Sequence, residues 1–413
     1  MKSEETGKEC CYLWFDVEQL KENQKQTIYM DNAATTYHKP SSVYDAMNEV
    51  NRCLSVNAGR GSYQLAQIAV EGMDKLRDEL LNLINGRNGA EVVFTPSATI
   101  AFNQIIGGLM LNSQDRVYVS PFEHNAVMRT LKLWQRKCGF SIEVLPMDVE
   151  KMEIDLEKTE YMFREKIPTH IFVTQVSNVT GYILPVAEIY SIGKEITEDK
   201  VKVIVDGAQS FGLVEIDYQR TPYDAIVFAG HKTLYGPFGI AGFIKNKTLS
   251  LEPCLAGGTG SDSLRLDMPE TIIGLEPSSP NIVGIAGLYA AVQFIHEKSV
   301  AAIYQYEKKL TEELKKCLKD IPGVTLYLPQ NLERQIGIVS FNVKGYRADE
   351  IGMILDEDYK IAVRTGYHCA PLIHDYLNDK ESGGTVRVGI SYFSKIEEIK
   401  ALGQAVRELA EGA

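Results

Sequence analysis

The sequence predicts an α/β fold with a mostly parallel sheet, and two observations carry this prediction. Short runs of β-branched and aromatic residues recur before residue 281, namely 91–94, 116–119, 170–174, 202–205 and 225–228. Amphipathic stretches with helical spacing lie between these runs, so that strand and helix alternate along the chain. Such alternation is typical of parallel strands that are connected by helices.

The helical stretches can be placed in order. We expect helices over residues 41–54, 64–84, 98–111, 126–138 and 186–197. After about residue 281 the pattern changes to a long helix through His296 and Lys315, strands near 323–328 and 337–342, and helices at Ala348 and Lys395. We therefore expect three parts: an N-terminal arm over 1–30 that packs with the small domain, a large domain over 31–280, and a small α+β domain over 281–413.

Composition excludes several classes of protein. The chain has 413 residues, of which 45% are hydrophobic, so it can bury a large core. Its longest apolar stretch, 282–295, is too short and too glycine-rich for a membrane span and is expected to be a buried helix. The start of the chain lacks the apolar core of a secretory signal, which predicts a cytoplasmic protein with no membrane partner. The net charge of −12 is spread over interspersed acidic and basic residues, so nucleic acid is not an expected partner.

The cysteines indicate reduced thiols. Seven cysteines are scattered through the sequence, with no Cys-x-x-Cys pair and no His/Cys cluster at zinc spacing, so no metal site is predicted. The adjacent Cys10 and Cys11 could form a redox device, but we interpret them as part of a terminal extension without a role.

Two neighbouring strand ends carry residues that suggest a carbonyl cofactor. The run 224–229 breaks at Gly230 and is followed by His231 and Lys232, and the run 201–205 ends in Asp206. Pyridoxal phosphate (PLP) needs a lysine at its aldehyde carbon and a carboxylate beside its pyridine nitrogen. Taken alone, Asp206 would be a turn residue and Lys232 a solvated loop lysine. Their occurrence together with the motifs below favours PLP.

Other strand ends are expected to converge on the same site. In an open α/β sheet, ligands bind beyond the carboxyl ends of the strands, where Ser97, His124 and Asn178 also fall. The amides of Ala98 and Thr99, at the start of a predicted helix, could hold a phosphate, although a plain Ser/Thr cap explains this segment equally well. His124 could stack on a pyridine ring, but a histidine at a helix start is more often a cap or a surface residue.

Nine motifs in order resemble one family. From residue 28 to the C-terminal helix the sequence is similar to the cysteine desulfurases of the class V aminotransferases, in the branch that also holds selenocysteine lyase-like proteins. The matching motifs are YMDNAATT (29–36), NAGRGSY (57–63), EHNA (123–126), VSNVTG (176–181), VDGAQS (205–210), GHK (230–232), GGTGS (257–261), RTGYHCAPL (364–372) and GTVRV (384–388). The resemblance implies fold type I of the PLP enzymes, with a large, mostly parallel seven-stranded sheet.

The resemblance also implies roles for individual residues. Lys232 would form the Schiff base with PLP, Asp206 would pair with the pyridinium and Gln209 would contact the ring hydroxyl. Further expected contacts are His124 on the ring, Ala98, Thr99 and His231 at the phosphate, Asn178 at both cofactor and substrate, Arg387, Arg364 and Ala33 at the substrate, and Thr259 at the phosphate of the neighbouring subunit of a homodimer.

The resemblance implies a reaction in which L-cysteine loses its sulfur to Cys369, leaving L-alanine and a persulfide. Lys232 would remove the Cα proton and the thiolate of Cys369 would attack the substrate sulfur. Cys369 could instead be a buried packing thiol. Arg364 and His368 nearby, with Gly366 and Pro371 loosening the segment, favour a reactive thiol. Because the segment is short, a sulfur-acceptor protein is expected to come to it.

Some alternatives stay open at this point. A selenocysteine lyase acting on L-selenocysteine shares the scaffold, and an aminotransferase or another C–S lyase would use PLP without needing Cys369. A nucleotide-binding protein is disfavoured, because no G-x-G-x-x-G follows a strand and no P-loop motif occurs. Two departures from the family pattern put a phosphate contact and the substrate choice in doubt: Ala229 replaces a frequent hydroxyl residue, and 277–281 replaces the usual Ala-Gly-Thr-Pro-Asn.

Overall fold

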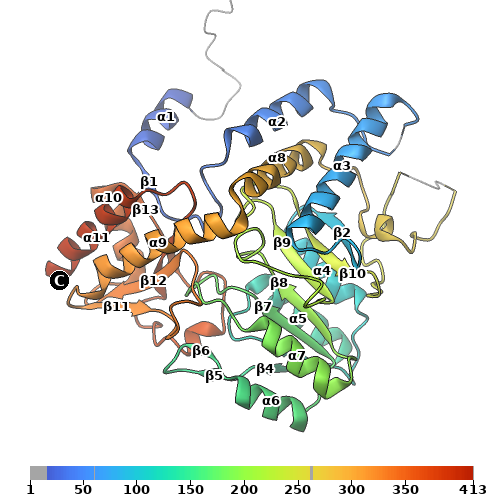
Figure 1. The fold of residues 1–413 in the computed structure, drawn as a ribbon. Helices are drawn as coiled ribbons and strands as arrows, with labels where there is room; N and C mark the ends of the chain where they lie inside the picture. Colours follow the sequence, from blue (N-terminus) through green and yellow to red (C-terminus); the bar gives the residue numbers. More distant parts are fainter. Residues whose placement is uncertain (1–15, 60, 261–263, 413) are drawn as a thin grey trace, which may run out of the picture.

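A seven-stranded sheet forms the centre of the larger part of the molecule (Figure 1). The computed structural model describes residues 16–59, 61–260 and 264–412, so Cys10 and Cys11 lie outside the described residues. The strand order is β2-β10-β9-β8-β7-β3-β4. Strand β10 runs antiparallel to β2 and β9, and the other neighbouring strands pair in parallel. The strands are β2 (Ala90–Thr95), β3 (Arg116–Val119), β4 (Ser141–Val144), β7 (His170–Thr174), β8 (Lys202–Asp206), β9 (Ala225–Ala229) and β10 (Ala241–Asn246). The predicted α/β class and mostly parallel seven-stranded sheet are confirmed.

Helices cover both faces of this sheet, because its strands are apolar on both sides. Along β8, Val203 and Val205 pack on one face and Ile204 on the other, as the two-residue period of a strand requires. Helices α4 (Ala98–Gly108) and α5 (Asn125–Cys138) cover the Ile204 face. The opposite face packs against α3 (Gln64–Leu83), α7 (Val186–Thr197) and α8 (Ile282–Lys298). Two further helices complete this part: α2 (Ser41–Cys53), which packs on α8, and α6 (Leu156–Glu165), which packs on α7.

A second, four-stranded antiparallel sheet has the order β11-β12-β15-β14. Its strands are β11 (Val324–Tyr327), β12 (Ile338–Val343), β14 (Arg364–Gly366) and β15 (Thr385–Gly389), and its helices are α9 (Val300–Lys319), α10 (Ala348–Tyr359) and α11 (Ile396–Glu411). Their apolar side chains form a separate core cluster. The N-terminal α1 (Val17–Gln26) precedes β1 (Ile28–Tyr29), which pairs in parallel with β13 (Ile361–Ala362) beside this sheet. The remaining elements are β5 (Met147–Asp148), β6 (Glu153–Ile154), η1 (Ile272–Leu275) and η2 (Ile373–Asp375).

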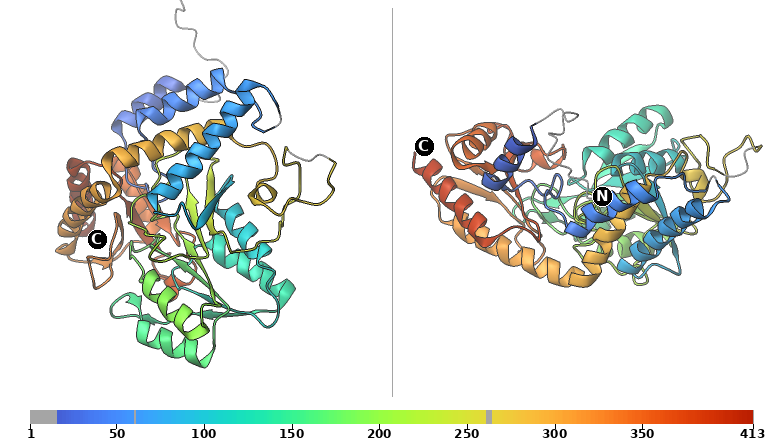
Figure 2. Two further views of the ribbon diagram at one scale, coloured as in Figure 1. Left: turned by 45° about the vertical axis from the view of Figure 1, so that its right-hand side comes forward. Right: turned by 90° about the horizontal axis from the view of Figure 1, so that it is seen from above.

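The helix that was predicted to run unbroken through His296 and Lys315 is two helices, and this part of the prediction was wrong. Ser299 separates α8 from α9 with φ of 68°, a value that ends an α-helix. Its backbone N–H donates to the carbonyl of Ile295 (2.8 Å), and its hydroxyl accepts from the amide of Ala302 (3.2 Å). One serine therefore caps both helices, and α9 leads from the large sheet to the small one (Figure 2).

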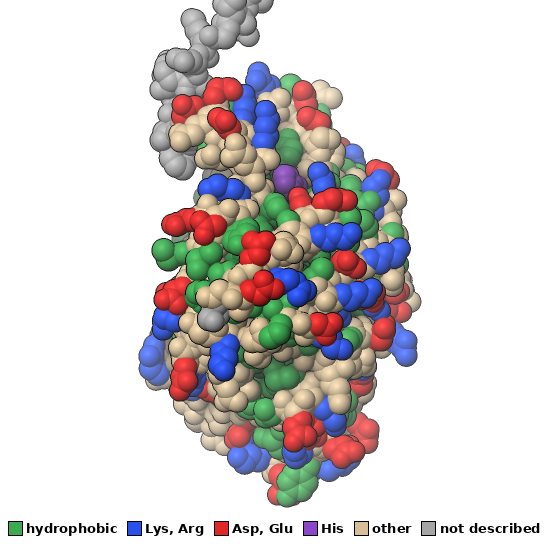
Figure 3. All heavy atoms as spheres, turned by 90° about the vertical axis from the view of Figure 1, so that its left-hand side faces the viewer, with side chains coloured by type: hydrophobic (Ala, Val, Ile, Leu, Met, Phe, Trp, Pro, Cys, Tyr) green, Lys and Arg blue, Asp and Glu red, His purple; other side chains and the backbone are tan. Residues whose placement is uncertain are grey.

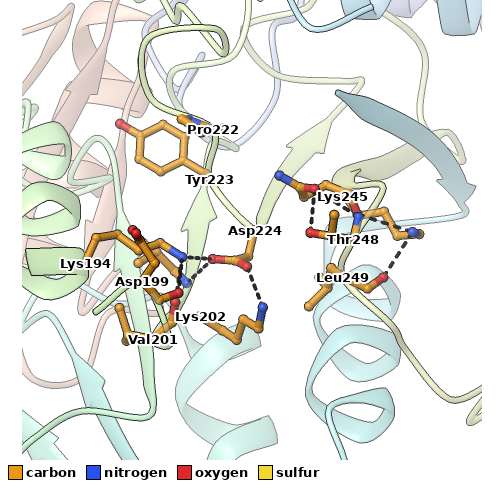
Figure 4. A network of polar contacts seen from close by, with 12 residues as sticks. Lys194, Asp199, Val201, Lys202, Pro222, Tyr223, Asp224, Lys245, Thr248 and Leu249 are labelled. Atoms are coloured by element: carbon orange, nitrogen blue, oxygen red, sulfur yellow. Dashed lines mark hydrogen bonds and ion pairs between the residues drawn. The ribbon is translucent and has the colours of Figure 1, made fainter. Parts of the chain in front are cut away.

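A charged network lies at the amino ends of β8 and β9 (Figure 4). Buried Asp224 accepts from Lys194 Nζ (3.2 Å) and from the amide of Val203 (2.9 Å), and Lys202 Nζ lies 3.3 Å from its other oxygen. The network occupies the edge of the sheet opposite to the strand ends where Asp206 and Ala229 lie. Its role is therefore to join strands rather than to serve the candidate site.

Charges on the surface are mixed. Figure 3 shows acidic and basic side chains interspersed on the face that carries α1 and the small sheet. In the part of the chain that the structure describes, no helix is both long and apolar enough to cross a membrane.

Candidate active site

A cavity of about 220 Å³ opens at the carboxyl ends of the central strands. It is bounded by the last residues of β7, β8 and β9, by the start of α4 and by β14 and β15 of the small sheet. Of the predicted site residues, eleven line it: Ala33, Ala98, Thr99, His124, Asn178, Asp206, Gln209, His231, Lys232, Arg364 and Arg387. Residues from nearly the whole length of the chain thus meet in one small space.

Asp206 and Lys232 both line this cavity, and the charge of each affects the pKa of the other. Burial raises the pKa of Asp206, while a hydrogen bond from the amide of Ala208 (2.9 Å) and the charge of Lys232 oppose the rise. Burial lowers the pKa of Lys232, and the charge of Asp206 opposes that shift. Both groups are thus pushed toward their neutral forms, and a neutral lysine amine is the nucleophilic form that can attack a carbonyl carbon.

The start of α4 presents free amides to the cavity. Ser97 caps the helix, and its side-chain oxygen accepts from the amide of Ile100 (3.3 Å). The capping interpretation of this segment is therefore correct for Ser97. The amides of Ala98 and Thr99 lie in the first turn and have no acceptor within the helix. Because the serine satisfies only one of the orphan donors, a cap at Ser97 leaves other amides of the first turn available.

His124 is held as a neutral ring. It caps α5, and its Nδ1 accepts from the amide of Ala126 (3.0 Å), which leaves the ring proton on Nε2. Burial, followed by the charges of Lys232, Arg364 and Arg387, lowers the pKa of His124 to about 3. The ring is therefore uncharged at neutral pH, which suits stacking on a flat aromatic ligand.

Arg387 and Asn178 join the two sheets at the cavity wall. The buried Arg387 donates from Nη1 to the carbonyl of Asn178 (3.0 Å) and from Nη2 to Asp31 (2.7 Å). One N–H of the Asn178 amide donates to the carbonyl of His368 (2.7 Å). Sequence reasoning gave no role to Asp31, although the residue lies in the matched motif 29–36; a buried arginine requires such a counter-charge.

Two other predicted contacts, Gln209 and His231, are partly occupied by protein groups, and Ala229, which departs from the family pattern, lines the same cavity. Gln209 donates from Nε2 to the carbonyl of Ala33 (2.7 Å), so its side-chain oxygen is the atom left for a ligand. His231 stacks on Phe238, with ring centroids 4.6 Å apart, and burial lowers the pKa of His231 to about 4. Ala229 ends β9 at the cavity wall and offers only a methyl group there.

Cys369 lies beside the cavity, with its Sγ 3.4 Å from Nη2 of Arg364. The thiol is thus in direct contact with a guanidinium group at the edge of the cavity. The expectation that Gly366 and Pro371 loosen this segment was wrong, because the carbonyl of Cys369 accepts from the amide of Asn125 (2.7 Å) and the amide of Ala370 donates to the carbonyl of Tyr367 (3.0 Å). Backbone hydrogen bonds therefore hold the loop that carries the thiol.

Thr259 does not line this cavity. It lies instead at a separate hollow of about 690 Å³, which is also bounded by Asn57, Gly59 and the unusual segment 277–281. Thr259 therefore lies outside the cavity that Lys232 and Asp206 of its own chain line.

Comparison with known proteins identifies the class of this fold and site. Residues 28–402 match the family model of the class-V aminotransferases. The chain belongs to this family and is an enzyme.

Its relatives narrow the class further. The chain is 34% identical over 394 residues to a probable cysteine desulfurase of Methanothermobacter thermautotrophicus, a match that covers 93% of this chain and 94% of the relative. It is 32% identical over 401 residues to a cysteine desulfurase of Escherichia coli K12, with 94% of each chain covered. The apo structure of a cysteine desulfurase from Thermococcus onnurineus NA1 superimposes with a TM-score of 0.87 at 29% identity, covering 97% of this chain and all of that one.

A prediction concerns Glu123, the buried neighbour of His124. Burial raises the pKa of Glu123 to about 8 from an ordinary 4.5, although the Ser120 hydroxyl (2.5 Å) and the Thr174 amide (2.6 Å) donate to its Oε1. Between these pH values the folded protein holds a proton that the unfolded chain has lost, so stability falls as the pH rises. Glu123→Gln should remove this slope and be more stable than wild type by on the order of a few kcal/mol at pH 8.

The measurement is thermal unfolding at pH 5 to 8, with the exposed Glu150→Gln as the matched control. Parallel profiles for Glu123→Gln and wild type would contradict the assignment of a proton to Glu123.

Proposed function

We propose that this enzyme is a PLP-dependent cysteine desulfurase, which removes sulfur from L-cysteine and leaves L-alanine and a persulfide on Cys369. The single observation that carries the proposal is that Lys232, Asp206 and Arg364 line one cavity, with the Sγ of Cys369 beside it at 3.4 Å from Arg364. A lysine and a carboxylate alone would fit many PLP enzymes. The thiol beside a guanidinium at the same cavity favours sulfur transfer over transamination.

The residues present fit PLP. Asp206 is buried, and hydrogen bonds reach only its Oδ1, so its second oxygen can accept from a protonated ring nitrogen. The amides of Ala98 and Thr99 can hold the phosphate at the start of α4, and the neutral His124 can cover the ring. Lys232 Nζ has no hydrogen bond or ion pair to any residue in the described ranges, so it can bond to the aldehyde carbon. Ala229 supplies no hydroxyl, so the phosphate depends more on the helix amides.

Different residues of the site can bind the substrate, move the proton and accept the sulfur. When bound, PLP would supply an electron sink for the Cα of L-cysteine. Arg387 and Asn178 line the cavity where a substrate carboxylate can be held, and the lowered pKa of Lys232 lets its amine take the Cα proton. Arg364 contacts the Sγ of Cys369 and can hold it in position beside the cavity. The thiolate forms an S–S bond with the substrate sulfur as the Cβ–S bond breaks, and Cβ keeps the electron pair and takes a proton.

The proposal extends to the partners of the enzyme. Thr259 and residues 57–59 border the larger hollow and not the cavity of Lys232, which supports a homodimer in which Thr259 serves the phosphate of the neighbouring subunit. Hydrogen bonds hold the loop of Cys369, so the persulfide would not swing out far. This supports delivery of sulfur to an acceptor protein that docks at the site. A thiol that must stay reduced fits the cytoplasm, and the cysteines of the described ranges are all free.

The first test concerns the cofactor. Protein purified with PLP should be yellow, borohydride should bleach it, and peptide mapping should find the reduced label on Lys232, because the buried amine there is the nucleophilic one. Lys232→Ala should lose the label, whereas the exposed Lys247→Ala should keep it. A protein that stays colourless after addition of PLP would rule out the proposal.

The second test concerns the thiol. Cys369→Ala should keep its colour and still bind L-cysteine, but its rate of alanine formation should fall by at least about 100-fold, as expected when a nucleophile is removed. Cys254→Ala, which removes an exposed cysteine elsewhere, is the matched control. Alanine formed at the wild-type rate by Cys369→Ala would leave PLP binding intact and refute sulfur transfer to Cys369.

A further inference from the structure

The loop that carries Cys369 contains strained backbone. Residues 367–384 connect β14 to β15, and within them His368 and Cys369 have φ values of 46° and 59°. Two consecutive non-glycine residues in the left-handed region are strained and persist only when surrounding contacts hold them. The position of the thiol thus depends on what anchors this turn.

Three successive carbonyls of the turn are held by hydrogen bonds. The carbonyls of His368 and Cys369 accept from Asn178 Nδ2 and from the amide of Asn125, both at 2.7 Å and both from the large sheet's side of the site. The carbonyl of Tyr367 is held from within the loop, by the amide of Ala370 and by Nε2 of His374, both at 3.0 Å. The side chain of His374 is thus the anchor that ties this carbonyl to the later part of the loop.

His374 is itself fixed by a buried carboxylate. Its Nδ1 lies 2.5 Å from Oδ2 of Asp379, and the two side chains are 2% and 0% exposed. Because a carbonyl only accepts, Nε2 must carry a proton, and one further proton is shared between Nδ1 and Asp379. The ring of Tyr367 packs edge-on against His374, with centroids 5.0 Å apart. The carboxylate thus sets the orientation of the imidazole that holds the turn.

Neither His374 nor Asp379 lines the catalytic cavity, and a buried ion pair adds little net stability relative to apolar residues of similar size. We propose that His374 and Asp379 are positioning residues for Cys369: they hold the Tyr367 carbonyl so that the strained turn keeps the thiol beside Arg364. This inference rests on the proposed function, since it is the attack on the substrate sulfur that needs the thiol in place.

The test uses a double variant that removes both partners together. His374→Phe/Asp379→Leu leaves no buried charge unpaired, so its melting temperature and PLP content should stay close to wild type. Its kcat for alanine formation should fall by about 10- to 100-fold, as for a misplaced reacting group, while KM for L-cysteine changes little. Hydrogen exchange in a peptide that covers 364–379 should become faster.

Two single variants complete the test. Asp379→Asn can donate to Nδ1 of a neutral ring and preserve the bond from Nε2 to Tyr367, so its kcat should stay within about threefold of wild type. Lys380→Ala breaks the exposed ion pair with Asp375 in the same loop and should leave kcat and exchange unchanged.

The outcomes separate two failures. Wild type that forms no alanine from L-cysteine would refute the proposed function, and the exchange experiment would still decide whether the pair holds the loop. An active wild type with unchanged kcat or unchanged exchange in the double variant would overturn the positioning role. If the double variant does not fold, a loss of kcat in Asp379→Asn without loss of PLP would equally overturn it.

Discussion

Desolvation of Asp206 and Lys232 in one cavity is the constraint on which the rest of the site depends. A buried carboxylate and a buried amine are costly unless each finds a partner, and here their pKa values move toward neutrality. The parallel sheet makes the arrangement possible, because the carboxyl ends of β7, β8 and β9 all lie at the edge of the sheet where the cavity is. The Asp224 network lies at the opposite edge. The fold thus buries both reactive groups at one cavity, and leaves atoms of both groups without hydrogen bonds and available to a cofactor.

The second constraint is that the site is built from both sheets. The segment 31–36 joins them, since Asn32 donates to the carbonyl of Gly389 (2.9 Å) and Thr35 donates to the carbonyl of His231 (2.9 Å) beside Lys232. Behind Lys232, the buried Tyr235 donates to Glu307 on α9 (2.8 Å). Arg387 and the Cys369 loop come from the small sheet and meet Asn178 and Asn125 of the large one. A change in how the two sheets pack would therefore move the thiol relative to Lys232.

Much of this could be predicted from the sequence, for physical reasons that differ between residues. Strand ends such as Asp206 are readable because an apolar run stops at a polar residue, and seven of the nine motifs supply nine of the predicted site residues that line the cavity. The break at Ser299 was missed because the apolar spacing continues across it, and only its capping bonds reveal it. Asp31 and the His374–Asp379 pair were missed because their partners are distant or are backbone carbonyls. No residue pattern encodes such contacts, and the loop of Cys369 was consequently expected to be looser than it is.

The central claim is that sulfur from L-cysteine reaches Cys369 and no other cysteine first. The most direct measurement is a single-turnover reaction of the PLP-loaded protein with L-cysteine, quenched early and analysed by mass spectrometry of cysteine-containing peptides. The account predicts that the peptide containing Cys369 gains the mass of one sulfur atom in step with alanine formation, and that a thiol reductant removes this mass. Alanine that forms while the Cys369 peptide stays unmodified, or sulfur that appears first on Cys254 or Cys53, would contradict it.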